Sequence, residues 1–359
     1  MDKSWQVTLM YVITHLGLIF FLYPGDIISS TEESHWIPIV LGFIVHILAI
    51  SIYMKGLGFL GKKDIISLYL GVGKGAALLF LLPMFVYFLM IYIIMVRSYA
   101  EIMTIIFLTG TPLWAIMVLF LIITTYIASK GVEAIFRTGV LIGLLCLPLI
   151  LLIFSASFQN VDWRYVFPLV DDFSFITNHS YLKSFFAFGG GFLFLGFVQP
   201  YFFYKQSKIL IAAFVLLPFF IFSVYIPVLT FGQATASTFH FPFIVTLDAI
   251  NITWLMFDRI TMFFLLSLIT FTMLFLSTIL WKTMRIVNRC MPSFKPVYLL
   301  ISISLFVFIV CLMIPSWEVV EKLFWWNTYL RFYILIAVPL STYYFAARAK
   351  RKVIYEADD

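Results

Sequence analysis

The chain has 359 residues, of which 63% are hydrophobic, 19% are aromatic and only 11% are charged, and its formal net charge is +6. A mean hydropathy of +1.07 excludes a water-soluble globular protein. In soluble proteins about a quarter of all residues are charged, which is about twice the fraction found here. We therefore expect a single polytopic membrane domain over residues 1–359, built from spans of about 20 apolar residues. The three cysteines are scattered, without paired or metal-ligand spacing, so we expect no metal and no cofactor.

Apolar runs bounded by charged or turn residues predict an all-α polytopic membrane protein with ten transmembrane helices. The first run contains ITHLGLIFFLYPGD and lacks the small-residue cleavage site of a signal peptide, so we expect it to remain in the mature protein. The predicted spans cover residues 5–29, 36–54, 76–104, 112–129, 134–155, 184–204, 209–231, 258–281, 297–315 and 325–347.

The distribution of Lys and Arg residues favours an even number of spans. With the amino terminus in the cytoplasm, 17 of the 23 Lys and Arg residues fall at cytoplasmic ends, including Lys282, and 6 fall on the opposite side, including Arg97 and Arg331. This asymmetry follows the positive-inside rule with both termini cytoplasmic. The positive net charge is therefore explained by the orientation of the spans in the membrane. We expect a lipid bilayer and no nucleic acid as a partner.

Ten spans divide into two five-helix repeats, residues 1–160 and 180–359, and the second repeat enters the membrane from the opposite side. In folds of this kind the first helix of each half is often broken, and the substrate binds near the breaks. Span 6 carries the glycine triplet Gly189 to Gly191, and span 1 carries His15 and Gly17 about midway. Each glycine costs about 1 kcal/mol of helix preference relative to alanine, so we expect both helices to be interrupted there. The alternative is that these glycines only allow close helix packing.

Two broken helices would offer free backbone groups without placing a formal charge in lipid. We expect an amino acid to bind there, with its carboxylate on the amides of Gly17, Leu18 and Ile19 and its ammonium on carbonyls near Phe188. Acidic residues fall in loops or at span ends. Tyrosines and cysteines aside, only two ionisable groups are predicted deep in the spans, His15 and His46, and a neutral histidine bonded to a neighbouring helix is the commoner role of either.

Several motifs recur in an order that resembles a known family. THLGLIFFLYPGDIISSTEESHWIPIVLG contains a glycine, a proline and a tryptophan that begins span 2, and YFLMIYIIMVRSYAEIM and FDRIT lie in span 3 and before span 8. These motifs resemble the spore germination permease family, the B subunits of bacterial nutrient-germinant receptors, in the amino acid, polyamine and organocation superfamily. The matching residues are Gly17, Pro24, Trp36, Tyr87, Arg97, Ala100, Glu101, Asp258 and Arg259.

This resemblance implies a LeuT-like fold with a 5+5 inverted repeat and broken helices 1 and 6. It also implies nutrient sensing, commonly of amino acids or sugars, in the spore inner membrane, together with a larger A-type subunit and a lipoprotein C-type subunit. Two features depart from relatives. Phe194 stands where some relatives carry a glutamate, and span 5 lacks the mid-depth lysine proposed as a proton carrier in related transporters.

We therefore expect a nutrient-sensing subunit of a spore germinant receptor, whose ligand is a small nutrient, most simply an amino acid. An enzyme is disfavoured, because no HExxH, GxSxG or CxxC motif and no pair of intramembrane carboxylates is present. An active amino-acid permease of the same fold is the alternative. The ligand is expected between spans 1, 3, 6 and 8, on backbone groups of the breaks and on side chains that shape a pocket. The predicted ligand-binding residues are Thr14, His15, Gly17, Leu18, Ile19, Tyr87, Ile91, Phe188, Gly189, Gly190, Gly191, Phe192, Ser267 and Thr270.

Overall fold

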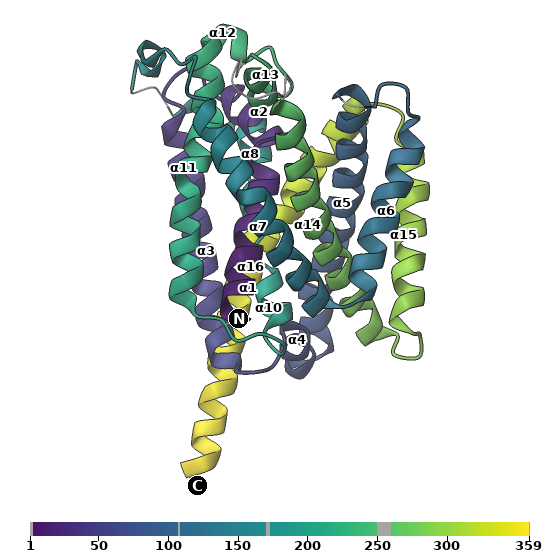
Figure 1. The fold of residues 1–359 in the computed structure, drawn as a ribbon. Coiled ribbons are helices and arrows are strands. Elements are labelled where there is room, and N and C mark those ends of the chain that lie inside the picture. Colours follow the sequence, from purple (N-terminus) through teal and green to yellow (C-terminus); the bar gives the residue numbers. More distant parts are fainter. Residues whose placement is uncertain (1–2, 107, 170–172, 250–259, 359) are drawn as a thin grey trace.

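The computed structural model describes residues 3–106, 108–169, 173–249 and 260–358, with side chains from residue 261 onward described as far as residue 351. Within these ranges every regular element is a helix, which confirms the all-α prediction (Figure 1). The helices are α1 (Lys3–Ile19), α2 (Leu22–Ile28), α3 (Trp36–Leu60), α4 (Ile65–Val72), α5 (Lys74–Ile106), α6 (Leu113–Ser129), α7 (Val132–Ala156), η1 (Trp163–Val166), η2 (Ser174–Thr177), α8 (His179–Ser184), α9 (Phe186–Gly189), α10 (Phe194–Val198), α11 (Gln206–Phe231), α12 (Gln233–Ala236), α13 (Pro242–Asp248), α14 (Ile260–Cys290), α15 (Pro296–Leu312) and α16 (Trp317–Asp358).

Most of the predicted spans correspond to helices that can cross a membrane. In the described part of the chain, 7 helical segments are long and apolar enough to do so, and the bent pair α1 and α2 makes an eighth. α6 and α15 are apolar helices of 17 residues each, slightly shorter than the roughly 20 residues of a typical span. The multi-pass character is thus confirmed, while the count of ten spans and the two repeats stay predictions.

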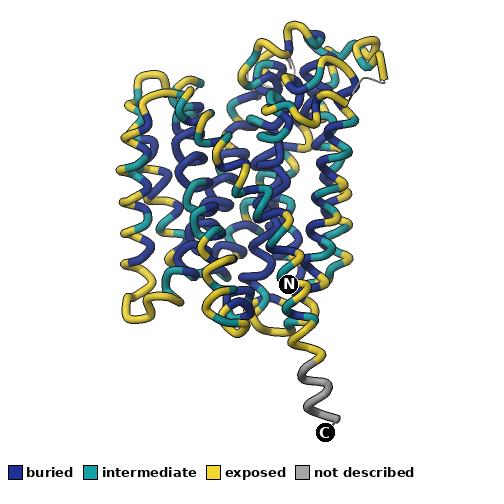
Figure 2. Tube along the Cα trace, turned by 180° about the vertical axis from the view of Figure 1, so that it is seen from behind, coloured by how far each residue is buried: buried dark blue, intermediate teal, exposed yellow. Residues whose placement is uncertain are grey.

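The helices pack around a buried centre with an apolar periphery. α14 packs against α1, α5, α6 and α7, and α16 packs along α3 and α5. Figure 2 shows buried residues along the middle of the molecule and exposed residues at its rim and ends. The outward face of α7 exposes Leu141, Leu144 and Leu145, each by at least 70%. Extensive exposed apolar surface of this kind suits contact with lipid.

The two ends of the chain lie toward the same end of the molecule (Figure 1). This agrees with an even number of crossings, and the cytoplasmic orientation of both ends stays a prediction. Ordinary capping signals define several helix ends. Oδ1 of Asp64 accepts a hydrogen bond from the amide of Ser67 at 2.9 Å and begins α4, and the Asn178 side chain begins α8 in the same way.

Two apolar segments are interrupted. α9 ends at Gly189 and α10 begins at Phe194, so the interruption in span 6 begins within the glycine triplet. α1 ends at Ile19 and α2 begins at Leu22, with a bend of 55° between them. The position predicted for the interruption in span 1 is therefore wrong by a few residues, because the helix continues through Gly17. Pro24 gives the physical reason, since proline lacks the amide hydrogen that a helix needs and clashes with the carbonyl four residues earlier, which is that of Phe20.

Candidate ligand-binding site

The triplet Gly189 to Gly191 lies against polar side chains from three other helices. A Cβ atom on the first glycine would lie 2.7 Å from Cγ of Arg331, which belongs to α16. On the second glycine it would lie 2.6 Å from the Tyr87 hydroxyl of α5, and on the third 2.8 Å from Nε2 of His15 of α1. Ordinary contacts of a Cβ atom begin at 3.4 Å. Three glycines thus allow three polar side chains to approach the backbone at one place.

Several polar atoms at this place have no hydrogen-bond partner in the described part of the protein. They are the Tyr87 hydroxyl, Nε2 of His15, Nε of Arg331 and Nδ2 of the neighbouring Asn327. All four residues are fully buried. A buried polar atom without a partner costs about 1–3 kcal/mol, and few such atoms are found in folded proteins. Because these atoms are concentrated in the region of the glycine triplet and Arg331, we treat this region as a candidate binding site.

Hydrogen bonds fix the roles of both buried histidines. Nδ1 of His15 donates to the Tyr11 carbonyl at 2.8 Å, because a carbonyl can only accept. In the neutral ring, Nε2 of His15 is then an acceptor, and it faces Gly191. His46 donates from Nδ1 to the Phe188 carbonyl at 3.0 Å and accepts from the Tyr11 hydroxyl at 2.6 Å. The predicted bond to a neighbouring helix is confirmed for His46, whereas His15 leaves an acceptor at the triplet.

Arg331 is buried inside the protein, which the sequence analysis did not predict. The sequence analysis expected only His15 and His46, tyrosines and cysteines aside, as ionisable groups deep in the spans, but the Arg331 side chain is also buried, at 0% exposure, within α16. Its terminal nitrogens donate to the Lys183 carbonyl at 2.8 Å, to Oδ1 of Asn327 at 3.0 Å and to Oγ1 of Thr328 at 3.4 Å. No carboxylate among the described side chains forms an ion pair with it. The expectation failed because long cationic side chains usually extend to the membrane surface, whereas these three acceptors hold the guanidinium inside.

A small cavity lies beside this arginine, with a volume of about 10 Å³. That is room for about one water molecule. Its wall is apolar except for one polar end, formed by Asn327 and Arg331. The lining residues are Leu18, Ile91, Ile94, Met95, Phe186, Phe275, Phe324, Asn327 and Arg331.

The structure brings a large part of the predicted site together. A Cβ atom on Gly191 would lie 3.3 Å from Cγ2 of Thr14, and one on Gly190 would lie 3.4 Å from Cδ1 of Ile91. Leu18 and Ile91 share the wall of the small cavity. The predicted residues that meet here are Thr14, His15, Leu18, Tyr87, Ile91, Gly189, Gly190 and Gly191.

Gly17 and Ile19 have a different arrangement from the one expected. Their amides belong to the last turn of α1, which offers carbonyls rather than free amides. The Gly17 carbonyl already accepts hydrogen bonds from the Tyr99 hydroxyl at 2.7 Å and from Oγ1 of Thr272 at 3.3 Å. The expectation that the amides of residues 17 to 19 bind a carboxylate is therefore wrong, because the helix is interrupted after these residues and not before them.

Four other predicted residues lie around the site or away from it. The Phe188 ring stacks on Phe220 with 4.6 Å between centroids, and the Phe192 ring lies 5.6 Å from that of His46. Both thus pack around the histidines. The hydroxyls of Ser267 and Thr270 bond to carbonyls of their own helix, at 2.8 and 2.7 Å. The residues of α14 that contact this region are instead Thr272, at Gly17, and Phe275, in the cavity wall.

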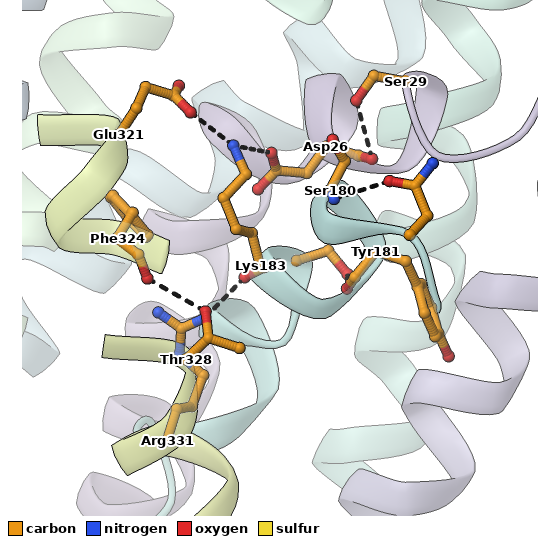
Figure 3. A network of polar contacts seen from close by, with 11 residues as sticks. Asp26, Ser29, Ser180, Tyr181, Lys183, Glu321, Phe324, Thr328 and Arg331 are labelled. Atoms are coloured by element: carbon orange, nitrogen blue, oxygen red, sulfur yellow. Dashed lines mark hydrogen bonds and ion pairs between the residues drawn. The ribbon is translucent and has the colours of Figure 1, made fainter. Parts of the chain in front are cut away.

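An ion cluster adjoins Arg331 and joins α2, α8 and α16 (Figure 3). Nζ of Lys183 lies 3.1 Å from Oδ1 of Asp26 and 2.6 Å from Oε2 of Glu321. The backbone carbonyl of Lys183 accepts the hydrogen bond from Arg331. We call Asp26, Lys183 and Glu321 the Lys183 cluster. The sequence analysis placed the acidic residues in loops or at span ends and did not pair these three, because pairing between distant segments has no local signal.

Two further cations are buried in the helices. Lys282 was expected at a cytoplasmic end, but it is 1% exposed, and its Nζ lies 4.2 Å from the centroid of the Phe88 ring. Arg97 forms an ion pair with Glu101, four residues later on α5. Arg97 also donates from Nε to the Ile314 carbonyl at 3.3 Å, which anchors it beyond its own helix. The motif residues 258 and 259 lie outside the described residues.

Comparisons with known proteins agree with this architecture. The crystal structure of MhsT in complex with L-phenylalanine matches with a TM-score of 0.62 at 14% sequence identity, over 94% of this chain and 88% of that chain. This likeness shows the fold. No curated protein sequence matches significantly. Residues 3–318 match the Spore_permease family model, described as "Spore germination protein". Since this match runs from the start of α1 to the second residue of α16 and so covers most of the chain, the chain belongs to the spore germination protein family.

Proposed function

We propose that the protein is the nutrient-binding, membrane-integral subunit of a spore germinant receptor and that its ligand is an amino acid. Two observations carry this proposal: unpartnered, buried polar atoms of Tyr87 and His15 face the glycine triplet, and those of Asn327 and Arg331 belong to residues that line the small cavity, with the Arg331 side chain in contact with Gly189. Donors and an acceptor thus lie in one buried region of the protein. A ligand that carries both kinds of group, as an amino acid does, would satisfy them together.

Family and fold support the same proposal. Membership of the spore germination protein family supports a germinant-receptor or permease-like role. The proposed arrangement is a LeuT-like 5+5 inverted repeat in which the first helix of each half is interrupted, at residues 20–21 and 190–193. MhsT has a similar fold and is described with bound L-phenylalanine. An amino acid is therefore the ligand class that we carry over to this chain.

The small cavity implies that the protein changes shape when it binds. A volume of about 10 Å³ holds about one water molecule and no amino acid. The interrupted segments between α1 and α2 and between α9 and α10 are where helices can move without breaking regular hydrogen bonds. A ligand that binds only the opened arrangement shifts the population toward it. A-type and lipoprotein C-type partner subunits in the spore inner membrane would respond to that shift, with both termini of this chain in the cytoplasm.

A binding screen with matched glycine variants tests the proposal. The purified protein is titrated with amino acids, sugars and nucleosides, with the shift in unfolding temperature as the measurement. Gly190→Ala places a methyl group 2.6 Å from the Tyr87 hydroxyl, whereas Gly58→Ala places one in open space. We expect an amino acid to stabilise the parent protein and Gly58→Ala, and to have little effect on Gly190→Ala. Equal stabilisation of all three by the same amino acid would remove the triplet from the binding site.

An active amino-acid permease is the second candidate, and one observation favours it. Lys282 is a buried amine in α14 that the sequence analysis placed at a membrane surface. Buried amines inside membrane proteins are among the groups that carry protons in pumps and transporters. Uptake measurements separate the two candidates.

A further inference from the structure

Arg331 is a buried cation that has neutral hydrogen-bond partners. Its terminal nitrogens bond to the Lys183 carbonyl and to the side chains of Asn327 and Thr328, and Nε has no partner in the described part of the protein. The acidic residues of the adjoining polar network, Asp26 and Glu321, are both paired with the Lys183 ammonium (Figure 3). A buried charge is expensive unless an opposite charge and further hydrogen bonds compensate it. The guanidinium thus lacks an anionic partner on the side where it lines the cavity.

Other donors lie on the same side. Nδ2 of Asn327 is a donor without a partner, and Asn327 lines the cavity together with Arg331. The Tyr87 hydroxyl, also without a partner, lies at the second glycine of the triplet, 3.6 Å from where a Cβ atom of Gly189 would be. A carboxylate accepts up to four hydrogen bonds and no neutral group of that size accepts as many.

Building on the function proposed above, we propose that Arg331 binds the carboxylate of the ligand, with Asn327 and Tyr87 as additional donors. This places the carboxylate on side chains of α16 and α5. It differs from the arrangement expected from sequence, in which the amides of residues 17 to 19 bind it. Those amides lie within the last turn of α1, so they are already used by the helix.

The opposite end of the triplet has the complementary character. Nε2 of His15 is an acceptor without a partner, and it faces Gly191. Donors at Gly189 and Gly190 and an acceptor at Gly191 form a polar axis along three residues. A zwitterion aligned with this axis has its carboxylate at Arg331 and its ammonium at His15. The apolar wall beside the donors, with Leu18, Ile91 and Phe275, suits an apolar side chain.

A comparison of acids with their amides tests the role of Arg331. The probes are L-alanine, L-valine, L-leucine and L-phenylalanine and the carboxamide of each, at about pH 6, where the amine of both forms is charged. Dissociation constants are measured for the purified full chain and for Arg331→Met, which keeps a long apolar side chain and removes the charge. Lys322→Met is the control, because it removes an exposed cation from the same helix.

We expect the parent protein and Lys322→Met to bind the preferred acid at least about 30-fold more tightly than its amide. In Arg331→Met the acid should bind about as weakly as the amide. A purely structural arginine, which only ties α16 to the Lys183 carbonyl, would weaken acid and amide by the same factor, and that result would overturn the proposal.

The comparison on the parent protein alone decides the matter if Arg331→Met fails to fold. Equal affinity of the parent protein for an acid and its amide overturns the role of Arg331 and leaves an amino-acid receptor in place. Binding of none of these eight probes, with binding of a sugar or nucleoside in the screen, overturns the amino-acid ligand and the role of Arg331 together.

Discussion

Loss of the Lys183 ammonium should be the most destabilising single change in the Lys183 cluster. Its Nζ lies 3.1 Å from Oδ1 of Asp26 and 2.6 Å from Oε2 of Glu321, so one ammonium serves two carboxylates on two other helices. The side chains of Lys183 and Asp26 are 15% and 13% exposed, whereas Glu321 is 43% exposed. Breaking a buried ion pair by removing one partner costs about 3–5 kcal/mol. An exposed pair contributes about 0–1 kcal/mol.

These magnitudes rank three variants. Lys183→Met leaves both carboxylates unpaired and should cost about 3–5 kcal/mol, mostly through Asp26. Asp26→Asn should cost less, because the ammonium keeps Glu321, and Glu321→Gln should cost under about 1 kcal/mol. For a chain of this length, 3–5 kcal/mol corresponds to a decrease in unfolding temperature of about 4–7 °C.

Thermal unfolding of the purified protein in detergent measures this ranking, with Lys322→Met as a control from the exposed face of α16. The control should unfold at the temperature of the parent protein. If Glu321→Gln lowers the unfolding temperature as much as Lys183→Met does, the distinction between the buried and the exposed pair is wrong.

Three further predictions concern the ligand and its transport. Tyr87→Phe should weaken the nutrient response and Ile91→Ala should change ligand preference, because both side chains lie against Gly190; unchanged dose–response curves of germination for every nutrient would assign them to packing. Gly17→Leu should abolish the response at near-normal protein level, because a Cβ atom there would lie only 3.3 Å from the amide nitrogen of Thr272. A full response in this variant would show that the close contact between α1 and α14 is not needed for function. In proteoliposomes the isolated subunit should bind its nutrient but not concentrate it under a proton gradient; concentrative uptake that is lost in His15→Ala or Lys282→Met would establish the permease instead.

The spans were predictable from sequence because hydropathy is a local property. A run of about 20 apolar residues specifies a helix in lipid whatever its neighbours are, since the backbone must satisfy its own hydrogen bonds. The glycine triplet was equally visible, and α9 does end at Gly189. The predicted interruption in span 1 lies too early in the chain because it was based on Gly17 and not on Pro24. Proline removes a hydrogen bond of the helix, whereas a glycine only lowers its preference, and Gly17 sits in a close contact with Thr272.

The polar half of the site was not predictable in the same way. A single arginine in an apolar run has the same local appearance whether it extends to the surface or stays inside. Its burial depends on acceptors supplied from elsewhere, here the Lys183 carbonyl, which lies 148 positions away in the chain, and Asn327, one turn earlier on α16. Only the second of these could be read from sequence, as a polar pair spaced four residues apart on one helix face. Such a pair inside a span is therefore the pattern that separates an internal cation from a surface one, and here it identifies the residue that we propose binds the ligand's carboxylate.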